Sequence, residues 1–347
     1  MGQRVVIHQL AADPIDAIER ATLEPMAMPD PRELGPRDVV VEVQSAAAGW
    51  VDLIMASGQY QHVPVPPYTP GLEYAGTVAW AGPEVDVAID ARVLVDPFLA
   101  GPRSSGAYRS YGGFASYAVA PAEAVHAIPG ALTFDQACNL LGNYETAYHC
   151  LIARGRLRAG ETVLVHGASG SVGLAAVHVA KLVGAIVIAT GRSPDKLAIV
   201  KAQGADHVIG TSNLKTDVKA LTGGRGVDVV YDGVGGDISI ESLRAVTFGA
   251  RYLIVGWAST PTARGKPNQL PTNLIMMKGL DVLGCPTVIS TVHDPSIRAD
   301  RLARVLAWAE AGQIAPYVSR AFPLAEFRAA LAAKWRGEVV GGCVVHP

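Results

Sequence analysis

The sequence predicts an α/β protein of two domains, the first rich in β-strands and the second built on a doubly wound parallel sheet. Three observations predict this architecture. Short strand-like runs, punctuated by Pro and Gly, dominate residues 1–128. Over residues 129–285, continuous apolar runs alternate with helix-compatible stretches, as in a parallel sheet buried on both faces. The length of 347 residues suits two hydrophobic cores of this size.

The β-rich domain is predicted from segments at both ends of the chain. Its first strands are RVVIHQL (4–10), DVVVEVQSAAAG (38–49), EYAGTVAWAG (73–82) and ARVLVDP (91–97). The polar, glycine-rich segment 99–113 is expected to be a mobile surface loop, of the kind that covers a site. After residue 285 the pattern gives a helix at 298–312, a strand at 317–322, a helix at 324–334 and a strand at 339–345. We assign 286–347 to the first domain, to which this segment is expected to return.

The second domain is predicted to hold six parallel strands with helices between them. Right-handed crossovers then make a doubly wound dinucleotide fold. The strands are 162–166, 185–190, 206–209, 227–232, 250–256 and 280–284, and helices include 172–183, 194–203 and 237–248.

Charge and composition exclude several classes of protein. With 29 basic and 31 acidic side chains, the chain is not expected to bind nucleic acid or an anionic membrane. No apolar run is long enough to span a bilayer, and the N-terminus lacks the features of a signal peptide. The four widely spaced cysteines form no disulfide framework and no CxxC pair, which favours a reduced, cytoplasmic setting.

The loop at 168–173 has the form A-x-G-x-x-G, a variant of the dinucleotide-binding fingerprint. Gly170 permits close approach of a pyrophosphate, and Gly173 permits the helix to pack against the preceding strand. The helix N-terminus at Ser171 and Val172, with Ser169 before it, favours an anion through its N–H groups and dipole. The position of the loop between a predicted strand and helix makes dinucleotide binding the preferred interpretation.

The next strand distinguishes the two nicotinamide cofactors. NAD sites usually carry an acidic residue near its end, but this sequence reads VIATGRSPDK there. Arg192, Ser193 and Lys196 suit a 2′-phosphate, so NADPH is favoured over NADH. The alternative is that these are solvated residues at a helix start, with Ser193 as N-cap before Pro194.

Taken in order, the motifs resemble those of the medium-chain dehydrogenase/reductase superfamily over nearly the whole chain. They are GWVDLIMASGQY (49–60), PGLEYAGTV (70–78), NYETAYHCL (143–151), VLVHGASGSVGLAAVHVAK (163–181) and VDVVYDGVGG (227–236). Within the superfamily the chain resembles the zinc-free quinone oxidoreductase branch, which includes zeta-crystallin and the VAT-1-like proteins. The resemblance implies a GroES-like catalytic domain (1–128 and 286–347), a Rossmann domain (129–285), and a homodimer formed along LDVLGC (280–285).

The resemblance also implies that the catalytic zinc of the alcohol dehydrogenases is missing. Their zinc ligands correspond here to Gly49, Leu72 and Gly142, which carry no donor atoms in their side chains. The neighbouring acids Asp52 and Glu73 are read as hydrogen-bonding residues rather than as catalytic acids. Without a Lewis acid, a conjugated acceptor such as a quinone or an enone is favoured over a simple ketone, because the added electrons delocalise.

Further site residues come from the same resemblance. Tyr60 matches a tyrosine beside the nicotinamide and is a candidate proton donor, the alternative being a tyrosine packed at a turn. Thr146 corresponds to a cofactor contact, and Asn143 and Tyr144 lie beside it. The turns after the fourth and fifth strands bring in Gly233, Val234, Val255 and Gly256.

The expected function is therefore NADPH-dependent, metal-independent reduction of a quinone or conjugated carbonyl, in a site between the domains. One alternative is a 2-enoyl-thioester or enone reductase. Another is an NADPH-binding protein without turnover, with a structural or RNA-binding role. Two departures from the family pattern, Thr211 and Gly342 in place of cofactor-binding side chains, leave more of the 2′-phosphate contact to Arg192.

Overall fold

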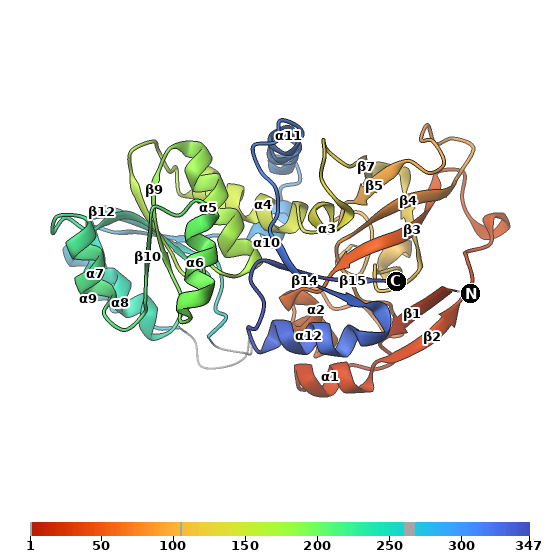
Figure 1. Cartoon of the computed structure of the whole chain (residues 1–347), viewed down its shortest axis with the longest axis horizontal. Helices are drawn as coiled ribbons and strands as arrows, with labels where there is room; N and C mark the ends of the chain where they lie inside the picture. The colour runs from red at the N-terminus through yellow and green to blue at the C-terminus, as the bar shows by residue number, and fades with distance from the viewer. Residues whose placement is uncertain (1, 105, 260–267) are drawn as a thin grey trace. The chain divides into compact units, whose positions relative to one another are not determined.

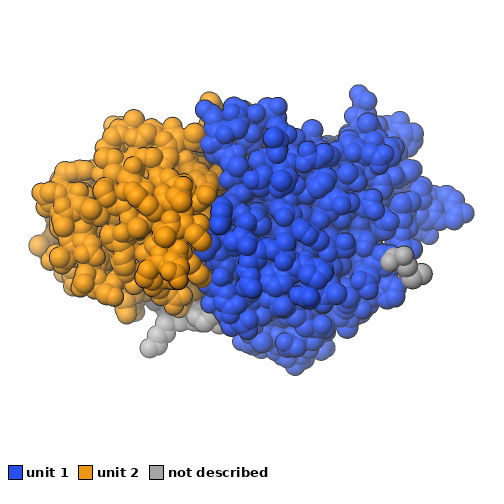
Figure 2. All heavy atoms as spheres, viewed as in Figure 1, with its two compact units in different colours: residues 1–142, 309–347 blue, residues 143–308 orange. Residues whose placement is uncertain are grey.

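The computed structural model describes residues 2–104, 106–259 and 268–347, which form two compact units (Figure 2). Unit 1 comprises residues 1–142 and 309–347, and unit 2 comprises residues 143–308. The boundaries fall inside two helices, α4 (Leu141–Tyr148) and α11 (Ile297–Glu310). The sequence pattern places these boundaries earlier, after residues 128 and 285. The reason is that a change in the strand pattern of the sequence marks the end of a sheet rather than the end of a compact unit.

Unit 1 is built on a seven-stranded sheet in the order β14-β15-β3-β4-β5-β7, in which β3 also pairs with β6. The long strand β3 pairs with β6 through its first half and with β15 at its end. Among the described pairings of this sheet, β14 with β15 is parallel and the others are antiparallel. The strands of unit 1 are β1 (Gly2–Val6), β2 (Thr22–Met26), β3 (Asp38–Ala47), β4 (Tyr74–Ala81), β5 (Arg92–Val95), β6 (Tyr117–Pro121), β7 (Val125–Ala127), β14 (Val318–Pro323) and β15 (Gly342–His346).

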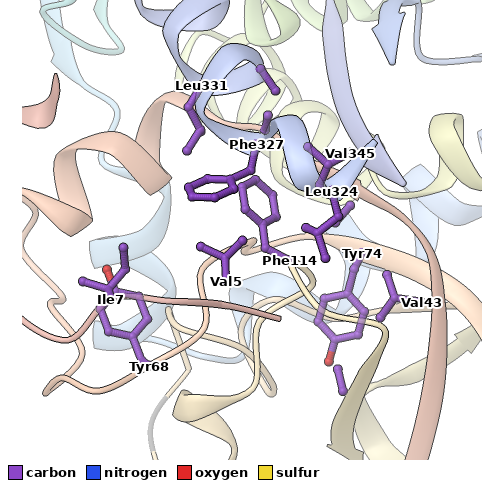
Figure 3. Packing of buried hydrophobic residues seen from close by; sticks show 14 of the residues in the cluster. Val5, Ile7, Val43, Tyr68, Tyr74, Phe114, Leu324, Phe327, Leu331 and Val345 are labelled. Atoms are coloured by element: carbon purple, nitrogen blue, oxygen red, sulfur yellow. The ribbon is translucent and has the colours of Figure 1, made fainter. Parts of the chain in front are cut away.

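Helices and strands of unit 1 share one apolar core (Figure 3). Val5, Phe114 and Phe327 are fully buried in it, and Leu331 joins them from α12. Burial of each such side chain contributes about 2 kcal/mol, so the C-terminal segment is held to unit 1 by its apolar face. The helices of unit 1 are α1 (Pro14–Arg20), α2 (Trp50–Ala56), α3 (Phe134–Ala137) and α12 (Phe327–Trp335), with short 3₁₀ turns at Pro31–Glu33, Ala107–Ser110, Ala122–Ala124 and Leu324–Glu326.

Unit 2 is the doubly wound parallel sheet that the sequence predicts (Figure 1). The strand order β10-β9-β8-β11-β12-β13 reverses direction between β8 and β11, which makes this pair the topological switch point. All five pairings are parallel. The strands are β8 (Thr162–Val165), β9 (Ile186–Thr190), β10 (His207–Ile209), β11 (Val227–Asp232), β12 (Val246–Ile254) and β13 (Asp281–Gly284).

The helices of unit 2 cover this sheet, α5 and α6 on one set of strands and α8 and α9 on the other. Helix α5 follows the extended Gly170 and ends at Gly184, whose φ of +85° is the left-handed conformation that glycine adopts most readily. Across the described ranges, no helix combines the length and apolar character needed to cross a membrane. The helices are α5 (Ser171–Val183), α6 (Pro194–Ala202), α7 (Leu214–Leu221), α8 (Asp237–Ala245), α9 (Thr272–Lys278) and α10 (Thr287–His293), with a π-helical turn at His149–Arg154.

Three predictions made from the sequence require correction. Strand β12 begins at Val246 rather than at 250, and the preceding helix ends at Ala245 rather than at 248. Gly249, at φ +75°, interrupts the pattern inside the strand at a shift of register and hides its true start. The segment 99–113 is not wholly a surface loop, because Ala100, Gly101, Pro102 and Ser104 are buried in unit 1.

Candidate functional site

The loop after β8 has the conformation that the fingerprint predicts. Gly167 has a φ of +61°, and an added Cβ at Gly173 would lie only 2.3 Å from the carbonyl oxygen of Gly167. Glycine at 173 is therefore what allows α5 to pack closely on the turn. Gly170 is exposed at the N-cap, and Ser169, Ser171 and Val172 are partly buried beside it.

The predicted residues after β11 and β12 gather at this same end of the sheet. The N–H of His166 donates to the carbonyl oxygen of Tyr231 over 3.0 Å, and an added Cβ at Gly167 would lie 3.1 Å from Cγ2 of Val234. Apart from its two chain neighbours, no described residue has a heavy atom within 4 Å of the position that a Cβ of Gly233 would occupy. These loops meet at the switch point, and Gly233, Val234, Val255 and Gly256 are partly buried there; we call this group of loops the cradle.

Asp232, which the sequence analysis did not single out, organises this cradle. Its Oδ1 accepts the N–H groups of Val234 and Gly235, both over 2.9 Å. Its Oδ2 accepts the hydroxyls of Ser239 (2.6 Å) and Tyr252 (2.5 Å). Burial raises the pKa of Asp232, but attraction to His166 and these hydrogen bonds outweigh it and hold the pKa below its usual value.

The end of β9 presents the three residues assigned to a 2′-phosphate. Arg192 is exposed, while Ser193 and Lys196 are partly buried at the start of α6. Ser193 is the N-cap, as the alternative interpretation holds, because its hydroxyl oxygen accepts the N–H of Lys196 over 3.5 Å. A hydroxyl that accepts this bond still has its own proton to donate, so capping and anion binding are compatible.

Two other polar residues of unit 2 have structural roles. His166 is buried between the hydroxyls of Thr190 (2.9 Å) and Ser242 (2.6 Å), and burial lowers its pKa to about 4 despite the charge of Asp232. Tyr144 is buried, and its hydroxyl bonds Nδ1 of His178 over 2.7 Å. Tyr144 therefore points into the interior of unit 2 and does not line the cradle. Thr146, on α4, is partly buried.

In unit 1, Asp52 binds the backbone at two of the positions that correspond to zinc ligands. Its Oδ2 accepts the N–H of Gly49 over 3.0 Å, and its Oδ1 accepts those of Gly71 (2.9 Å) and Leu72 (3.2 Å). Burial raises the pKa of Asp52 to about 6, against these hydrogen bonds and the charge of Arg103, which lower it. The structural role expected for Asp52 is confirmed by these contacts.

Glu73 has the corresponding role at the third position. Its carboxylate accepts the N–H of Gly142 over 2.6 Å, and a Cβ added at Gly142 would lie 2.5 Å from Oε2 of Glu73. The three positions thus offer backbone N–H donors rather than metal-ligand atoms. The two neighbouring acids, Asp52 and Glu73, accept hydrogen bonds from these donors. Nowhere in residues 2–104, 106–259 and 268–347 do three or more His, Cys, Asp or Glu side chains gather as a metal site. The side chains at positions 49, 72 and 142 offer no donor atom to a zinc ion.

Tyr60 lies in the turn after α2 and is partly buried. Its ring meets that of His62 edge to face, with centroids 6.2 Å apart. Burial raises the pKa of Tyr60, while the charge and hydrogen bonding of the neighbouring Arg103 act against the rise. Tyr60 is therefore a neutral phenol at pH 7. Arg103 lies in the glycine-rich segment 99–113, and that place is its only signal in the sequence.

One departure from the family pattern has a steric reason. A Cβ at Gly342 would lie 2.8 Å from the Asn139 side chain and 2.9 Å from Cγ2 of Val318. A lysine at this position would therefore require its neighbours to move.

Comparisons with known proteins agree with this architecture. Residues 35–130 match the family described as alcohol dehydrogenase GroES-like domain, and residues 171–295 match the family described as zinc-binding dehydrogenase. A quinone oxidoreductase-like protein 2 homolog of Nematostella vectensis is 34% identical over 315 residues, covering 88% of this chain and 82% of the relative.

Two solved structures are similar over nearly the full length. A probable oxidoreductase from Mycobacterium abscessus has a TM-score of 0.81 at 30% identity and covers 100% of both chains. The quinone oxidoreductase from Thermus thermophilus, solved also as its NADPH complex, has a TM-score of 0.80 at 26% identity and covers 99% of this chain and 100% of its own.

A GroES-like unit joined to a Rossmann unit defines the class of medium-chain dehydrogenases and reductases. Within that class, the chain belongs to the quinone oxidoreductase branch, and it is an oxidoreductase.

Proposed function

We propose that this protein is an NADPH-dependent, metal-independent reductase of quinones or α,β-unsaturated carbonyl compounds. The observation that carries the proposal is the cradle at the β8–β11 switch point, with Arg192, Ser193 and Lys196 at the end of the adjacent strand β9. The similar oxidoreductase from Thermus thermophilus forms a complex with NADPH, which supports the same cofactor here.

The small-residue loops are suited to hold the dinucleotide. The N-terminus of α5 offers backbone N–H groups and the positive end of a helix dipole to the pyrophosphate. Two cationic side chains and one hydroxyl suit a 2′-phosphate, whereas a carboxylate in their place would suit a 2′-hydroxyl. When bound, NADPH supplies a hydride at C4 of its nicotinamide.

Tyr60 is the candidate for the accompanying proton. Its pKa is raised, so the hydroxyl stays protonated at neutral pH and can hydrogen-bond the carbonyl oxygen of an acceptor and then donate its proton to the reduced product. Gly49, Leu72 and Gly142 supply no metal ligand, and this favours acceptors that delocalise the added charge themselves.

An acceptor panel tests the reaction class. Oxidation of NADPH and of NADH is followed by the absorbance of the reduced nicotinamide, with a benzoquinone, an enone and an enoyl thioester as acceptors. We expect turnover with the quinone or the enone and preference for NADPH. Turnover confined to the enoyl thioester would establish the alternative reductase, and oxidation of neither nucleotide would overturn the proposal.

Two variants assign the roles of the residues. Arg192→Ala should raise the KM for NADPH about tenfold or more and leave that for NADH nearly unchanged, because a charge-assisted contact to the 2′-phosphate is lost. Arg304→Ala, at an exposed arginine, is the control for the loss of one positive charge alone. Tyr60→Phe should lower kcat about a hundredfold. Tyr68→Phe is its control, because the Tyr68 hydroxyl is buried without a hydrogen-bond partner.

We also propose a homodimer formed along β13. This strand lies at the edge of the six-stranded sheet, so a second copy of the chain would continue the sheet. Light scattering coupled to size exclusion measures the molar mass, and a monomer at micromolar concentration would contradict this assembly.

A further inference from the structure

Strand β13 forms an open edge of the six-stranded sheet in unit 2. Among the described strands it is the last in the sheet order, and it pairs with β12. The N–H of Cys285 donates to the carbonyl oxygen of Ile254 on β12 over 3.0 Å. Because successive residues of a strand point their backbone groups to opposite sides, Leu283 also faces β12. The N–H and carbonyl groups of Val282 and Gly284 therefore point away from β12, to the open edge.

Two backbone groups at this edge already have partners within the chain. Nε of Arg154 donates to the carbonyl oxygen of Gly284 over 3.1 Å. The N–H of Leu280, two residues before Val282, donates to the carbonyl oxygen of Ile275 over 3.1 Å at the end of α9. Both groups of Val282, the N–H of Gly284 and the carbonyl of Leu280 are thus left to a strand that pairs here.

These four groups match a second copy of the same edge. A two-fold axis makes the two copies of β13 antiparallel, so that one surface meets itself. With Val282 opposite Val282 of the partner subunit, each of these residues donates its N–H to the other's carbonyl oxygen. The N–H of Gly284 then meets the carbonyl of Leu280 of the partner subunit, and the symmetric bond forms as well. All the groups left at the edge are satisfied in this register.

The two neighbouring registers satisfy fewer of these groups. A two-fold axis centred on Leu283 would place Val282 opposite Gly284 of the partner subunit. The N–H of Val282 would then compete with the guanidinium of Arg154 for one carbonyl. A shift by one residue in the other direction would place Val282 opposite Leu280 of the partner subunit, whose N–H is already used. A backbone group without a partner in an interface is unfavourable, so the register centred on Val282 is preferred.

Exposed apolar side chains flank β13 at both of its ends. Before the strand, Met276 and Met277 of α9 are 73% and 65% exposed. After the strand, Ile289 and Val292 of α10 are 39% and 60% exposed. An antiparallel pair brings the start of one strand beside the end of the other, so these two apolar groups meet across the two-fold axis. This match of the edge with itself favours a second copy of the chain as its partner.

We propose that two copies of this chain pair through antiparallel β13 strands centred on Val282, and that Arg154 selects this register by binding the carbonyl of Gly284. The inference rests on the homodimer proposed above and adds the atoms that join its subunits. Arg154 acts as a register-determining residue, because its guanidinium occupies the one acceptor that the register centred on Leu283 requires.

Disulfide mapping tests the register. In Val282→Cys the two new thiols lie directly opposite each other, with Cα atoms about 5.5 Å apart, and we expect a cross-linked dimer after mild oxidation. Leu283→Cys is the matched control, because its two Cα atoms lie diagonally, about 7–8 Å apart, outside disulfide reach. The four native cysteines are buried, so the native protein provides the baseline without cross-links. Non-reducing electrophoresis measures the cross-linked fraction.

Each result of the mapping decides between named assemblies. A cross-link in Leu283→Cys but not in Val282→Cys would establish the neighbouring register and overturn the proposal. A dimer by light scattering in which neither variant cross-links would place the interface elsewhere and also overturn it. A monomer of the native protein would contradict the homodimer itself, so the failure of the assembly and the failure of its register remain distinguishable.

The role of Arg154 is tested in the Leu283→Cys background. Arg154→Met frees the carbonyl of Gly284, and we expect a Leu283→Cys cross-link to appear as the second register becomes available. Arg154→Lys keeps a cationic donor at this position and should suppress that cross-link. An unchanged cross-linking pattern in Arg154→Met would contradict selection of the register by this side chain.

The apolar flanks are tested by the dissociation constant of the dimer. Met277→Asp places a charge where two apolar groups meet, and it should raise this constant about tenfold or more. Ile186→Asp is the control, since Ile186 is exposed on β9, four strands away from β13. Dilution followed by light scattering gives both constants. Equal dissociation constants for native protein and Met277→Asp would overturn the meeting of the two flanks.

Discussion

Asp52 in unit 1 and Asp232 in unit 2 perform the same task in two loops, but their pKa values move in opposite directions. Each is buried and accepts backbone N–H groups that fix a glycine-containing turn. The pKa of Asp52 rises to about 6, whereas the pKa of Asp232 falls. Asp232 also accepts two hydroxyl groups and lies near His166, whereas the hydrogen bonds described for Asp52 all come from backbone N–H groups.

The comparison shows that the surroundings of a buried carboxylate decide its charge more than the number of backbone donors does. Asp52 accepts three backbone N–H groups and Asp232 accepts two. Additional hydroxyl donors offset the cost of burying the charge of Asp232. The Asp52 loop therefore holds a carboxylate whose pKa lies near neutral pH, and the loop after β11 holds one that is ionised at neutral pH.

Asp232→Ala should have the largest effect. It leaves three buried donors and one partly buried donor without their acceptor, and we expect a loss of about 4 kcal/mol in the free energy of unfolding of unit 2. Chemical denaturation measures this loss, and hydrogen exchange locates it in β11 and α8. Asp237→Ala, at an exposed aspartate at the start of α8, should cost less than about 1 kcal/mol. Equal losses of stability in the two variants would contradict the structural role assigned to Asp232.

Asp52→Asn should have an intermediate effect of about 2 kcal/mol on the stability of unit 1. An amide presents an oxygen on one side only, so either Gly49 or the pair Gly71 and Leu72 faces an NH₂ group instead of an acceptor. Denaturant titration gives the loss, and faster exchange of these amides locates it. Asp86→Asn, at an exposed side chain, should stay within about 0.5 kcal/mol of the native protein.

The smallest expected effect is the pH dependence that separates the two aspartates. Because the pKa of Asp52 is raised on folding, its contribution is fully present below its unfolded pKa and is lost as the pH rises through about 6. Lowering the pH from 7 to 5 should therefore enlarge the cost of Asp52→Asn by about 1 kcal/mol. Titration of histidines is common to the native and variant proteins and cancels in this difference.

The cost of Asp232→Ala should stay constant over the same interval. Because folding lowers the pKa of Asp232, the stability that its carboxylate contributes is lost only in more acidic solution, as the pH falls through its pKa in the folded protein. A cost of Asp232→Ala that changes with pH between 5 and 7, or one of Asp52→Asn that does not, would contradict the assigned difference.

Local sequence patterns predicted much of unit 2 and its cradle. The segment VLVHGASGSVG specifies strand, turn and helix within eleven neighbouring residues, since each small residue answers a steric need of its own turn. Ser193 and Pro194 likewise define the start of α6 at one position. Such features are local, so a single sequence is sufficient to find them.

Contacts between distant residues could not be predicted in this way. Asp232 is completed by Tyr252 from the next strand, and Asp52 accepts the N–H groups of Gly71 and Leu72 from a different segment. The hydrophobic periodicity of a segment does not encode such a partner, because tertiary packing determines which distant residue lies beside it. The π-helical turn at His149–Arg154 was missed for the same reason, since its hydrogen-bond register leaves no periodic signature.

The contact between Glu73 and Gly142 sets a condition for protein engineers who wish to graft a transition metal onto this scaffold. A histidine or cysteine introduced at 142 alone would place its first side-chain carbon against the carboxylate that now occupies that space. Glu73 would have to be shortened in the same step, and the N–H of Gly142 would need another acceptor. The route from this oxidoreductase to a metalloenzyme therefore begins with a paired substitution.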